Sequence, residues 1–416
     1  MIWLLGGYMW LFIHRPFEYW PTLGALQVER VYMIVMIVFW AVAPGKKWIP
    51  NRLHFALIAF FGVLMASWLV SPYAPLLVDT VENYCKVAIF YLLVVTTVHD
   101  TQGLRRLLHL YLFAVALYMG HSLLEFFHGR MQWRQGIRRM VGVDVTFGDP
   151  NAFAAGLVYS VAMTLPVWYD RPGPMMRLFL WWFSGCACVC VVLTGSRAGF
   201  VGLLVCASLC LWLAGRKKEI LLLAVAGVAG ALAMPGDLQN RFLTIIDPSY
   251  GPKNAQTSAT GRLDGLIYGF MAWQQSPVLG NGPDSFRWAT GRQGGAHNVY
   301  GQLISEVGAL GALAFAGILL GFGYNNAEAR RYYRHRPVRD RDLPFYVCRA
   351  VGVCVILLCF LGMAGHNLYR YYWLWFAAFQ MIALHCIREQ AALVGAHRPV
   401  CVAASSWRWR PAPGWA

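Results

Sequence analysis

Twelve apolar segments follow one another along the chain at fairly even spacing. A helix that crosses a bilayer needs about 20 mostly apolar residues, and most of these segments approach that length. The first two are short for a span, so the pattern predicts eleven or twelve transmembrane helices. The segments lie near residues 1–14, 29–44, 53–71, 76–98, 104–128, 151–169, 176–194, 198–214, 219–235, 298–323, 346–364 and 368–388.

The polar stretches between these segments predict a single membrane domain over residues 1–416. No low-complexity linker divides the chain, and the N-terminal segment lacks the basic region and cleavage site of a signal peptide. The longest polar stretch, 236–297, is predicted to be one long extramembrane loop, and within it LIYGFMAWQQ is predicted to form an amphipathic helix on the membrane surface. Residues 389–416 are predicted to form a cytoplasmic tail.

The composition favours the same fold class. Hydrophobic residues make up 58% of the chain and charged residues only 13%, whereas soluble domains carry about 25% charged residues. So few charges could not cover the surface of a water-soluble globule of 416 residues. We therefore expect an all-α polytopic membrane protein.

In a soluble protein, a net charge of +16 would suggest binding to nucleic acid. In a membrane protein, the side of the membrane that holds the charge matters more. With the N-terminus inside, the inner segments hold 20 Lys and Arg residues and the outer segments hold 13. The rule that positive charges concentrate in cytoplasmic loops favours this orientation. It also places both 236–297 and 129–150 on the outer face.

The outer basic residues are almost all arginine. Twelve of the 13 are Arg, and they cluster in 129–150 and 236–297. Arginine stays charged and offers a planar fork of donors that suits phosphate oxygens. The set predicts binding of a phosphorylated ligand, although a GC-rich coding sequence could also favour Arg.

Metal and nucleotide sites are not expected. The eleven cysteines include no CxxC or Cys/His spacing of the zinc type, and most lie in apolar runs as small apolar residues. No phosphate-binding loop of the GxxxxGK[ST] type is present. Asp340 and Asp342 flank Arg341 like the Asp-x-Asp of nucleotide-sugar enzymes, but they lie in an inner loop and are interpreted as solvated.

Three outer residues are the main candidates for chemistry. Arg197 lies in TGSRAGF between two spans, Arg262 lies in the long loop, and His297 opens the next span. An interfacial anchor, a solvated loop charge and a helix-capping histidine are the respective alternatives. Glycines precede His297, and Gly301 and Gly308 are predicted to share its helical face. The glycines before it are Gly280, Gly282, Gly291, Gly294 and Gly295.

Charged residues within spans are also of interest, because they are rare and often functional. Glu82 and Lys86 are four residues apart, which predicts an ion pair inside the fourth span. Glu125, His366 and Arg370 lie near the outer surface, where a structural and a functional role both remain open.

Several motifs together resemble the bacterial O-antigen ligase/polymerase superfamily. TGSRAGF resembles its Ser-Arg-Gly signature, GRLDGLIYGFMAWQQSPVLGNGPDSF resembles its Arg, Pro-x-x-Gly-x-Gly and Phe pattern, and AHNVYGQLISEVGALG resembles its His-Asn helix start. FGDPNAFA and HRPFEYWPTLGALQVER are similar to further segments found in some members. By motif the resemblance covers about 145–310, and by helix pattern it covers the whole chain.

The resemblance implies a glycosyltransferase of the C-type architecture in the bacterial inner membrane, with its active site facing the periplasm. Members take a glycan from an undecaprenyl-diphosphate carrier and transfer it to a hydroxyl of lipid A-core, a growing glycan or a protein, without metal or other cofactor. Arg197 and Arg262 would bind the leaving diphosphate, and His297 would accept the proton of the acceptor hydroxyl or orient that group. The further candidates for substrate contacts are Arg287, Arg292, Asn298, Arg138, Arg139 and Asn151.

Other functions remain open at this point. A transporter or flippase is the alternative from another class, but such proteins place charge and broken helices near the bilayer midplane. Within the enzyme class, a repeat-unit polymerase and a protein O-oligosaccharyltransferase share the same motifs. Ligation to a separate acceptor is favoured because the Arg and His motifs form one compact block. The arginines in 130–139 could instead form a second carrier site.

Overall fold

A computed structural model describes residues 1–134, 137–146, 148–232, 236–243, 253–292, 294–334 and 342–396. The first half contains α1 (Ile2–His14), α2 (Pro16–Tyr19), α3 (Pro21–Ala25), α4 (Val28–Val42), α5 (Leu53–Val70), the 3-10 helix η1 (Ala74–Leu76), α6 (Val78–Thr97), α7 (Thr101–Phe127), the strands β1 (Met131–Arg134) and β2 (Ile137–Met140), α8 (Pro150–Ala162), α9 (Leu165–Tyr169) and α10 (Pro174–Leu193). The second half contains α11 (Arg197–Leu213), α12 (Lys218–Leu232), α13 (Gly236–Leu243), α14 (Lys253–Gln275), α15 (Phe286–Thr290), α16 (Val299–Tyr332), α17 (Leu343–Gly362) and α18 (Tyr372–Ala396).

The protein is an all-α polytopic membrane protein, as the apolar pattern predicts. Helices occur in all twelve predicted segments. Within the residues that the structure describes, six of them are both long and apolar enough to cross a membrane, and α11 is a shorter apolar helix of 17 residues. The six spans are Leu53–Val70, Thr101–Phe127, Pro150–Tyr169, Pro174–Leu193, Val299–Tyr332 and Leu343–Gly362.

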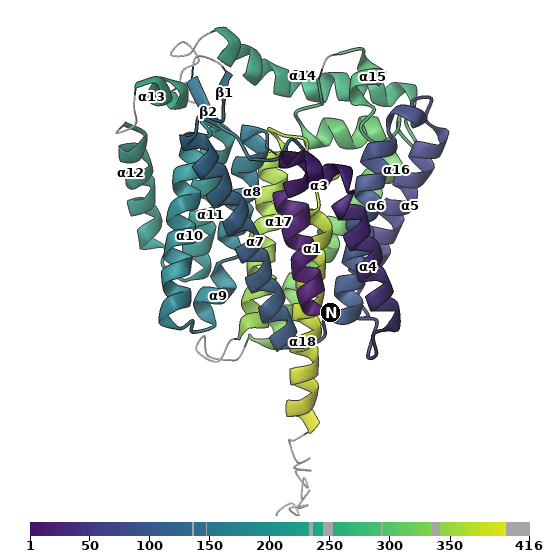
Figure 1. Cartoon of the computed structure of the whole chain (residues 1–416), viewed down its shortest axis with the longest axis vertical. Coiled ribbons are helices and arrows are strands. Elements are labelled where there is room, and N and C mark those ends of the chain that lie inside the picture. Colours follow the sequence, from purple (N-terminus) through teal and green to yellow (C-terminus); the bar gives the residue numbers. More distant parts are fainter. Residues whose placement is uncertain are drawn as a thin grey trace, which may run out of the picture.

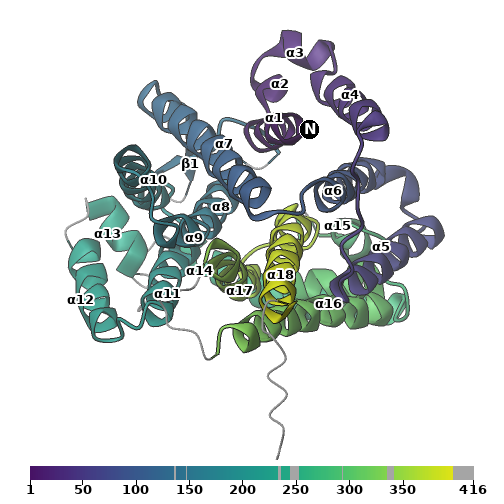
Figure 2. The same ribbon diagram turned by 90° about the horizontal axis from the view of Figure 1, so that it is seen from below.

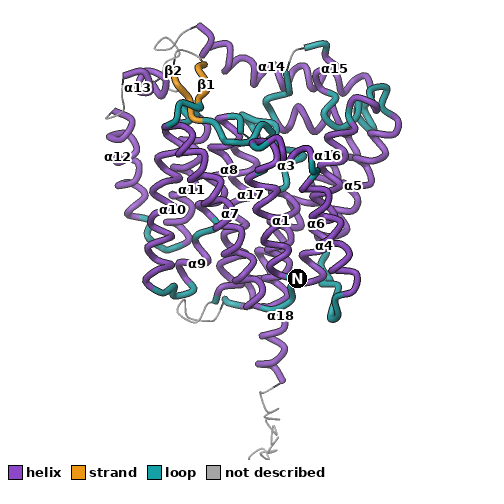
Figure 3. The backbone as a smooth tube through the Cα atoms, viewed as in Figure 1, coloured by secondary structure: helices purple, strands orange, loops and turns teal. Residues whose placement is uncertain are grey.

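The two ends of the bundle differ. The chain begins near one end, and α18 projects from that same end (Figure 1). The opposite end is covered by α13, α14, α15 and the β1–β2 hairpin, and we call it the capped end (Figures 1 and 3). The predicted loop 236–297 is therefore largely helical where it is described, and LIYGFMAWQQ forms the second half of α14. Because α14 lies across the bundle and does not run along it, it agrees with the predicted surface helix.

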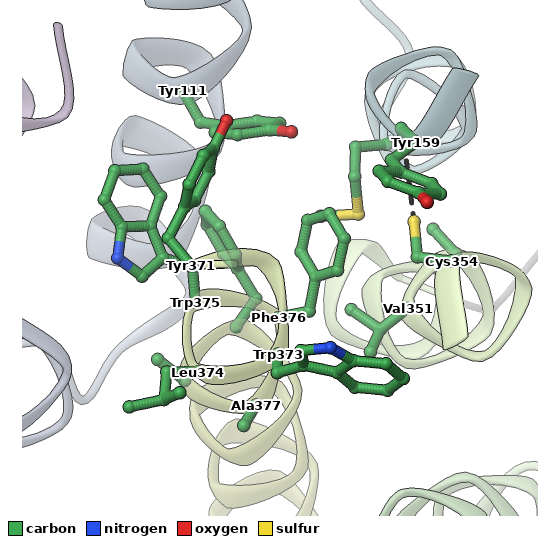
Figure 4. Close-up of a cluster of buried hydrophobic side chains, with 14 of the residues drawn as sticks. Tyr111, Tyr159, Val351, Cys354, Tyr371, Trp373, Leu374, Trp375, Phe376 and Ala377 are labelled. Atoms are coloured by element: carbon green, nitrogen blue, oxygen red, sulfur yellow. Dashed lines mark hydrogen bonds between the residues drawn. The ribbon is translucent and has the colours of Figure 1, made fainter. Parts of the chain in front are cut away.

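The core of the bundle is centred on α17 and α18, which lie among the other helices when the protein is viewed along the bundle (Figure 2). Trp373 and Phe376 of α18 are almost fully buried beside Tyr159 of α8 and Cys354 of α17 (Figure 4). The Cys354 thiol donates to the carbonyl oxygen of Tyr159 at 3.4 Å. The cysteine therefore behaves as the small buried residue that its apolar setting predicts.

The predicted ion pair between Glu82 and Lys86 of α6 is confirmed. Lys86 Nζ lies 3.1 Å from Glu82 Oε1 and 3.3 Å from Glu29 Oε2 on α4. Arg30 of α4 also bonds both carboxylate oxygens of Glu82, at 2.9 and 3.1 Å. These alternating charges tie α4 to α6, so a structural role accounts for them.

Helix α16 is broken at Gly308, where φ is +64° and ψ is −164°. The predicted common face for His297, Gly301 and Gly308 is therefore wrong. His297 lies before the helix in a left-handed conformation with φ of +47°, and α16 begins only after its N-cap, Asn298. A single helical face cannot continue through residues whose backbone is not helical.

The segment 277–282 replaces the hydrogen bonds that α16 loses at the break, and we call this segment with Gly308 the glycine clip. On one side of the break, the amides of Asn281 and Gly282 donate to the carbonyls of Ser305 and Glu306 at 2.9 and 3.0 Å. On the other side, Ala309 and Leu310 donate to the carbonyls of residues 277 and 278 at 2.9 and 3.1 Å. Buried backbone groups need partners, and the clip supplies them across the break.

Glycine is required in the clip because two backbones meet there. A Cβ at Gly280 would overlap the carbonyl group of Glu306, and a Cβ at Gly308 would lie 2.5 Å from the amide nitrogen of Gly280. Both glycines also have φ values, +72° and +64°, that other residues rarely adopt. The Pro-x-x-Gly-x-Gly pattern thus packs against the backbone of α16.

Some predicted features lie partly outside the described residues. The tail predicted from residue 389 begins later, since α18 continues to Ala396, and residues 397–416 are not described. Phe147, Asp340 and Arg341 are also outside the described ranges. Asp342 is described, and it caps α17 by accepting from the amide of Phe345.

Candidate functional site

Arg197 is the first residue of α11 and is presented by a tight turn. Gly195 has a φ of +58°, so the chain reverses sharply between α10 and α11. Ser196 then caps α11, its hydroxyl accepting from the amide of Gly199 at 3.2 Å. Gly195 and Ser196 therefore place Arg197 at the start of a helix at the capped end.

Two buried arginines donate hydrogen bonds to the backbone carbonyls of this turn. Arg139 of β2 donates through Nε to the carbonyl of Thr194 at 2.7 Å and through Nη2 to Asn151 Oδ1 at 2.9 Å. Arg241 of α13 donates through Nε to the carbonyl of Gly195. The exposed fractions of Arg139 and Arg241 are 2% and 8%. The hairpin, α13 and the start of α8 thus meet at one turn.

The start of α8 forms the neighbouring wall. Asp149 caps this helix by accepting from the amides of Asn151 and Ala152 at 2.9 and 3.3 Å, and Pro150 occupies the first turn. This is the favoured chemistry for a helix start, with a short acidic side chain followed by proline. The Asp149-Pro150-Asn151 sequence therefore starts α8 beside Arg139.

Arg262 reaches the site from α14, which packs closely on the beginning of α16. Gly265 and Gly269 face Ala296 and Gly301 across this contact, where an added Cβ would overlap backbone atoms on the other side. Desolvation, together with the nearby charge of Arg197, lowers the pKa of the Arg262 guanidinium. Two positive charges that repel each other in this way indicate a site built for an anion.

His297 lies just before α16, next to the N-cap residue of that helix. Its ring centroid is 5.5 Å from that of His366, which belongs to the connection between α17 and α18. Desolvation and the positive charges of Arg370 and His297 lower the pKa of His366 to about 4, with Asp149 acting in the opposite direction. His366 is therefore neutral near pH 7 and can accept or donate a hydrogen bond.

These residues surround one cavity of about 540 Å³, the arginine cavity. Its lining combines five arginines, two histidines and one aspartate with an apolar floor of α8, α17 and α18. The polar and charged residues of the lining are Arg139, Asp149, Asn151, Arg197, Arg241, Arg262, His297, His366, Asn367 and Arg370. The first turns of α8 and α11 also line it, and their partial positive charge favours anions.

The structure brings together five of the nine predicted site residues. Arg197, Arg262, His297, Arg139 and Asn151 all line the arginine cavity. The other four lie elsewhere on the capped end or have structural contacts, and they are Arg287, Arg292, Asn298 and Arg138.

Each of these four has a visible contact. Arg287 lies over the ring of Trp288, at 4.9 Å from its centroid, and Arg292 over that of Tyr268, at 4.0 Å. Arg138 lies 5.8 Å from the ring of Trp133 on the exposed side of the hairpin. Asn298 caps α16 by accepting from the amides of Tyr300 and Gly301.

Four of the arginine, histidine and aspartate residues that line the cavity were left open or unassigned by the sequence. Arg370 and His366 were noted only as residues near the outer surface, and Arg241 only as one of the outer basic residues. Asp149 lies in a motif but was not a candidate. Asp149 could have been found from its place before Pro150 and Asn151 in the resembling segment, whereas Arg241 carries no local signal.

No group of three or more His, Cys, Asp or Glu residues suited to a metal ion is found in the part of the chain that the structure describes. The lining is instead rich in fixed cations, which hold anions.

Comparison with known proteins identifies the central part of the chain. Residues 182–316 match the family model described as O-antigen ligase. The match begins within α10 and ends within α16, so it includes Arg197, Arg241, Arg262 and His297. No curated protein matches the chain.

Proposed function

We propose that this protein, a member of the O-antigen ligase/polymerase superfamily, transfers a glycan from an undecaprenyl-diphosphate carrier to a hydroxyl group of an acceptor. The acceptor class that we favour is lipid A-core or a similar glycolipid. The observation that carries the proposal is the meeting of Arg197, Arg262 and His297 in one cavity at the capped end. A diphosphate ester with a sugar beside it fits cations on one wall and a base on another.

Arg197 and Arg262 are proposed to bind the diphosphate. As the bond between the anomeric carbon and the diphosphate oxygen breaks, negative charge grows on the leaving group. Fixed guanidinium groups stabilise that charge more than they stabilise the ground state, which lowers the barrier. The partial positive charge at the start of α11 adds to the same effect.

His297 is proposed to act on the acceptor. The acceptor oxygen attacks the anomeric carbon from the side opposite the diphosphate, and His297 takes the proton of that hydroxyl. The unperturbed pKa of histidine is near neutral, which suits proton transfer at physiological pH. The attack forms one C–O bond as the other breaks, so the configuration of the anomeric carbon is inverted.

The proposed location is the bacterial inner membrane, with the arginine cavity facing the periplasm. The excess of Lys and Arg in the segments at the other end supports this orientation. Reporter fusions test it: a fusion after Lys217 should be cytoplasmic and one at Ala255, in α14, periplasmic. A cytoplasmic reporter at Ala255 would place the cavity on the wrong side for a periplasmic carrier.

Ligation is favoured over repeat-unit polymerisation by the place of Arg139. A polymerase must admit two lipid-linked chains, and the arginines of 130–139 were the candidates for a second carrier site. Arg139 instead lines the same cavity as Arg197, and Arg138 lies over Trp133. Deletion of the gene distinguishes a ligase from a polymerase. Loss of a ligase leaves long glycans on the carrier, whereas loss of a polymerase leaves acceptors with a single repeat.

The direct test is transfer by the purified protein in detergent, with an undecaprenyl-diphosphate-linked oligosaccharide as donor. We expect wild-type transfer to the acceptor and loss of transfer in His297→Ala. The matched control is His128→Ala, since His128 is an exposed histidine at the capped end that does not line the cavity. Transfer by His297→Ala at the wild-type rate would refute its role. Transport of the intact donor without bond cleavage would favour a flippase.

A further inference from the structure

The turn that presents Arg197 is held by two side chains that the sequence does not connect with it. Arg139 and Arg241 donate to the carbonyls of Thr194 and Gly195, the two residues immediately before the cap of α11. These carbonyls lie at the C-terminal end of α10, where a helix carries partial negative charge. A guanidinium is therefore stabilised there even when it is almost fully buried.

Arg139 also connects two motifs. Its Nε bonds Thr194 and its Nη2 bonds Asn151, so a single planar group joins the end of α10 to the first turn of α8. Arginine alone among the side chains carries several donors in a fixed fork. The TGSR and DPN segments are thus kept at a fixed separation by one residue from the hairpin.

Packing supports the same conclusion. A Cβ at Gly195 would lie 2.6 Å from Ile137 Cδ1 and 3.3 Å from the side chain of Arg241. Side chains of the hairpin and of α13 therefore both pack closely against the turn. The alternation of β2 points Arg139 toward the turn and its neighbour Arg138 toward the surface.

We propose that Arg139 and Arg241 are positioning residues that fix the turn before α11, so that Arg197 is aimed at the leaving diphosphate. The proposal rests on the proposed function, in which Arg197 binds that group. Their action is through backbone carbonyls, so the geometry of their donors matters more than their charge. This assigns the hairpin and α13 a part in catalysis although neither supplies the reacting groups.

The alternative is that both arginines contact the substrate directly, since both line the cavity. Replacement by lysine separates the two roles. Lysine keeps the charge but has a single terminal nitrogen, so Arg139→Lys cannot reproduce the planar geometry in which Nε bonds Thr194 and Nη2 bonds Asn151. Arg241→Lys can still reach the single carbonyl of Gly195. Positioning therefore predicts a larger loss of kcat in Arg139→Lys than in Arg241→Lys, with little change in KM for the donor.

A double-mutant cycle gives the decisive comparison. If Arg139 acts through Arg197, adding Arg139→Lys to Arg197→Ala will lower kcat no further than Arg197→Ala alone. If Arg139 contacts the substrate independently, the two losses will multiply. Asn151→Ala should reproduce part of the Arg139→Lys effect, because it removes one end of the bridge without changing charge. Arg138→Ala is the matched control, and it should behave as wild type.

Folding and the proposed function are checked separately. The thermal midpoint of each variant shows whether the protein is folded. Inorganic diphosphate stands for the leaving group and not for the donor, so the stabilisation that it gives should fall in Arg139→Lys even though the KM for the donor changes little. Wild-type protein that binds diphosphate but transfers no glycan would refute the proposed function alone. Multiplicative losses, or Arg139→Lys with the kcat and diphosphate response of wild type, would overturn the positioning role.

Discussion

The arginine cavity and the glycine clip both include residues of the segment between α13 and the start of α16, yet they use their polar groups in opposite ways. In the cavity, charged side chains from five or more elements converge on open space. In the clip, backbone amides and carbonyls of 277–282 are satisfied by those of α16. These two neighbouring motifs thus have different tasks. One contacts the substrate in our proposal, and the other holds the scaffold.

The difference shows how glycine and arginine should be interpreted in such a sequence. Glycine permits close approach of a backbone, but the sequence does not say whether the approaching partner is a ligand or the protein. Buried arginine has a large desolvation penalty, so a cluster of them requires an anion or carbonyl groups to interact with. Substitutions in the cavity should therefore lower kcat, whereas substitutions in the clip should lower the stability of the fold.

The largest expected effect is at the cavity. Arg197→Ala or Arg262→Ala should lower kcat about 10²–10³-fold, since each removes one fixed donor to the leaving group. The thermal midpoint should stay close to that of wild type. Steady-state transfer with a lipid-linked donor, measured beside thermal unfolding, checks both. Wild-type kcat in either variant would show that the diphosphate does not lie between these two guanidiniums.

At the clip, the expected loss is in stability. Gly280→Ala or Gly308→Ala should reduce the free energy of unfolding by about 1–2 kcal/mol for the positive φ and by about 1–3 kcal/mol more for the overlap with backbone atoms. Gly291→Ala is the control, because Gly291 also has a positive φ, +65°, but open space around it. Equal loss of thermal stability in Gly280→Ala and Gly291→Ala would contradict the close contact.

A smaller effect concerns pH and His366. Its pKa is lowered to about 4 in the folded protein, against about 6.5 for an ordinary histidine. Between these values the unfolded chain binds more protons, so stability is lost as pH falls from about 6.5 toward 4. His366→Gln should weaken this decline in the thermal midpoint. An identical decline in the variant would mean that other groups cause it.

The smallest effects are expected at the arginines outside the cavity. Arg287→Ala and Arg292→Ala should leave kcat near that of wild type and change stability by roughly 0.5 kcal/mol. Both side chains lie over aromatic rings at the capped end and do not line the cavity. A large loss of kcat in either variant would show that the substrate site extends beyond the arginine cavity to α15.

The helices and the main members of the cavity could be predicted because their signals are local. Apolar runs define the spans, and TGSR, Arg262 and His297 stand in recognisable sequence surroundings. Their convergence also followed from the orientation, which placed all three at one face. The predicted helical face of His297 failed because Gly308 interrupts α16, and sequence spacing assumes a continuous helix.

The remaining members of the cavity depend on tertiary structure. Arg241 and Arg370 come from separate segments, and no spacing along the chain indicates that they meet. The roles of Arg138 and Arg139 differ only because a hairpin forms and gives neighbouring residues opposite faces. That hairpin has a weak signal, since four-residue strands rich in Arg do not show the usual alternation of apolar and polar residues.

The break in α16 also decides how far this element reaches. A straight helix of its 34 residues would be about 51 Å long at about 1.5 Å per residue, well beyond a hydrocarbon layer of about 30 Å. The 24 residues after Gly308 span about 36 Å, which a modest tilt accommodates. The ten residues up to the break would otherwise carry the His297 end about 15 Å farther out along the same axis. By turning that segment aside, one glycine keeps the rest of this long helix to a length that suits a membrane, and in our proposal the headgroup of the lipid-linked donor lies at the level of the break.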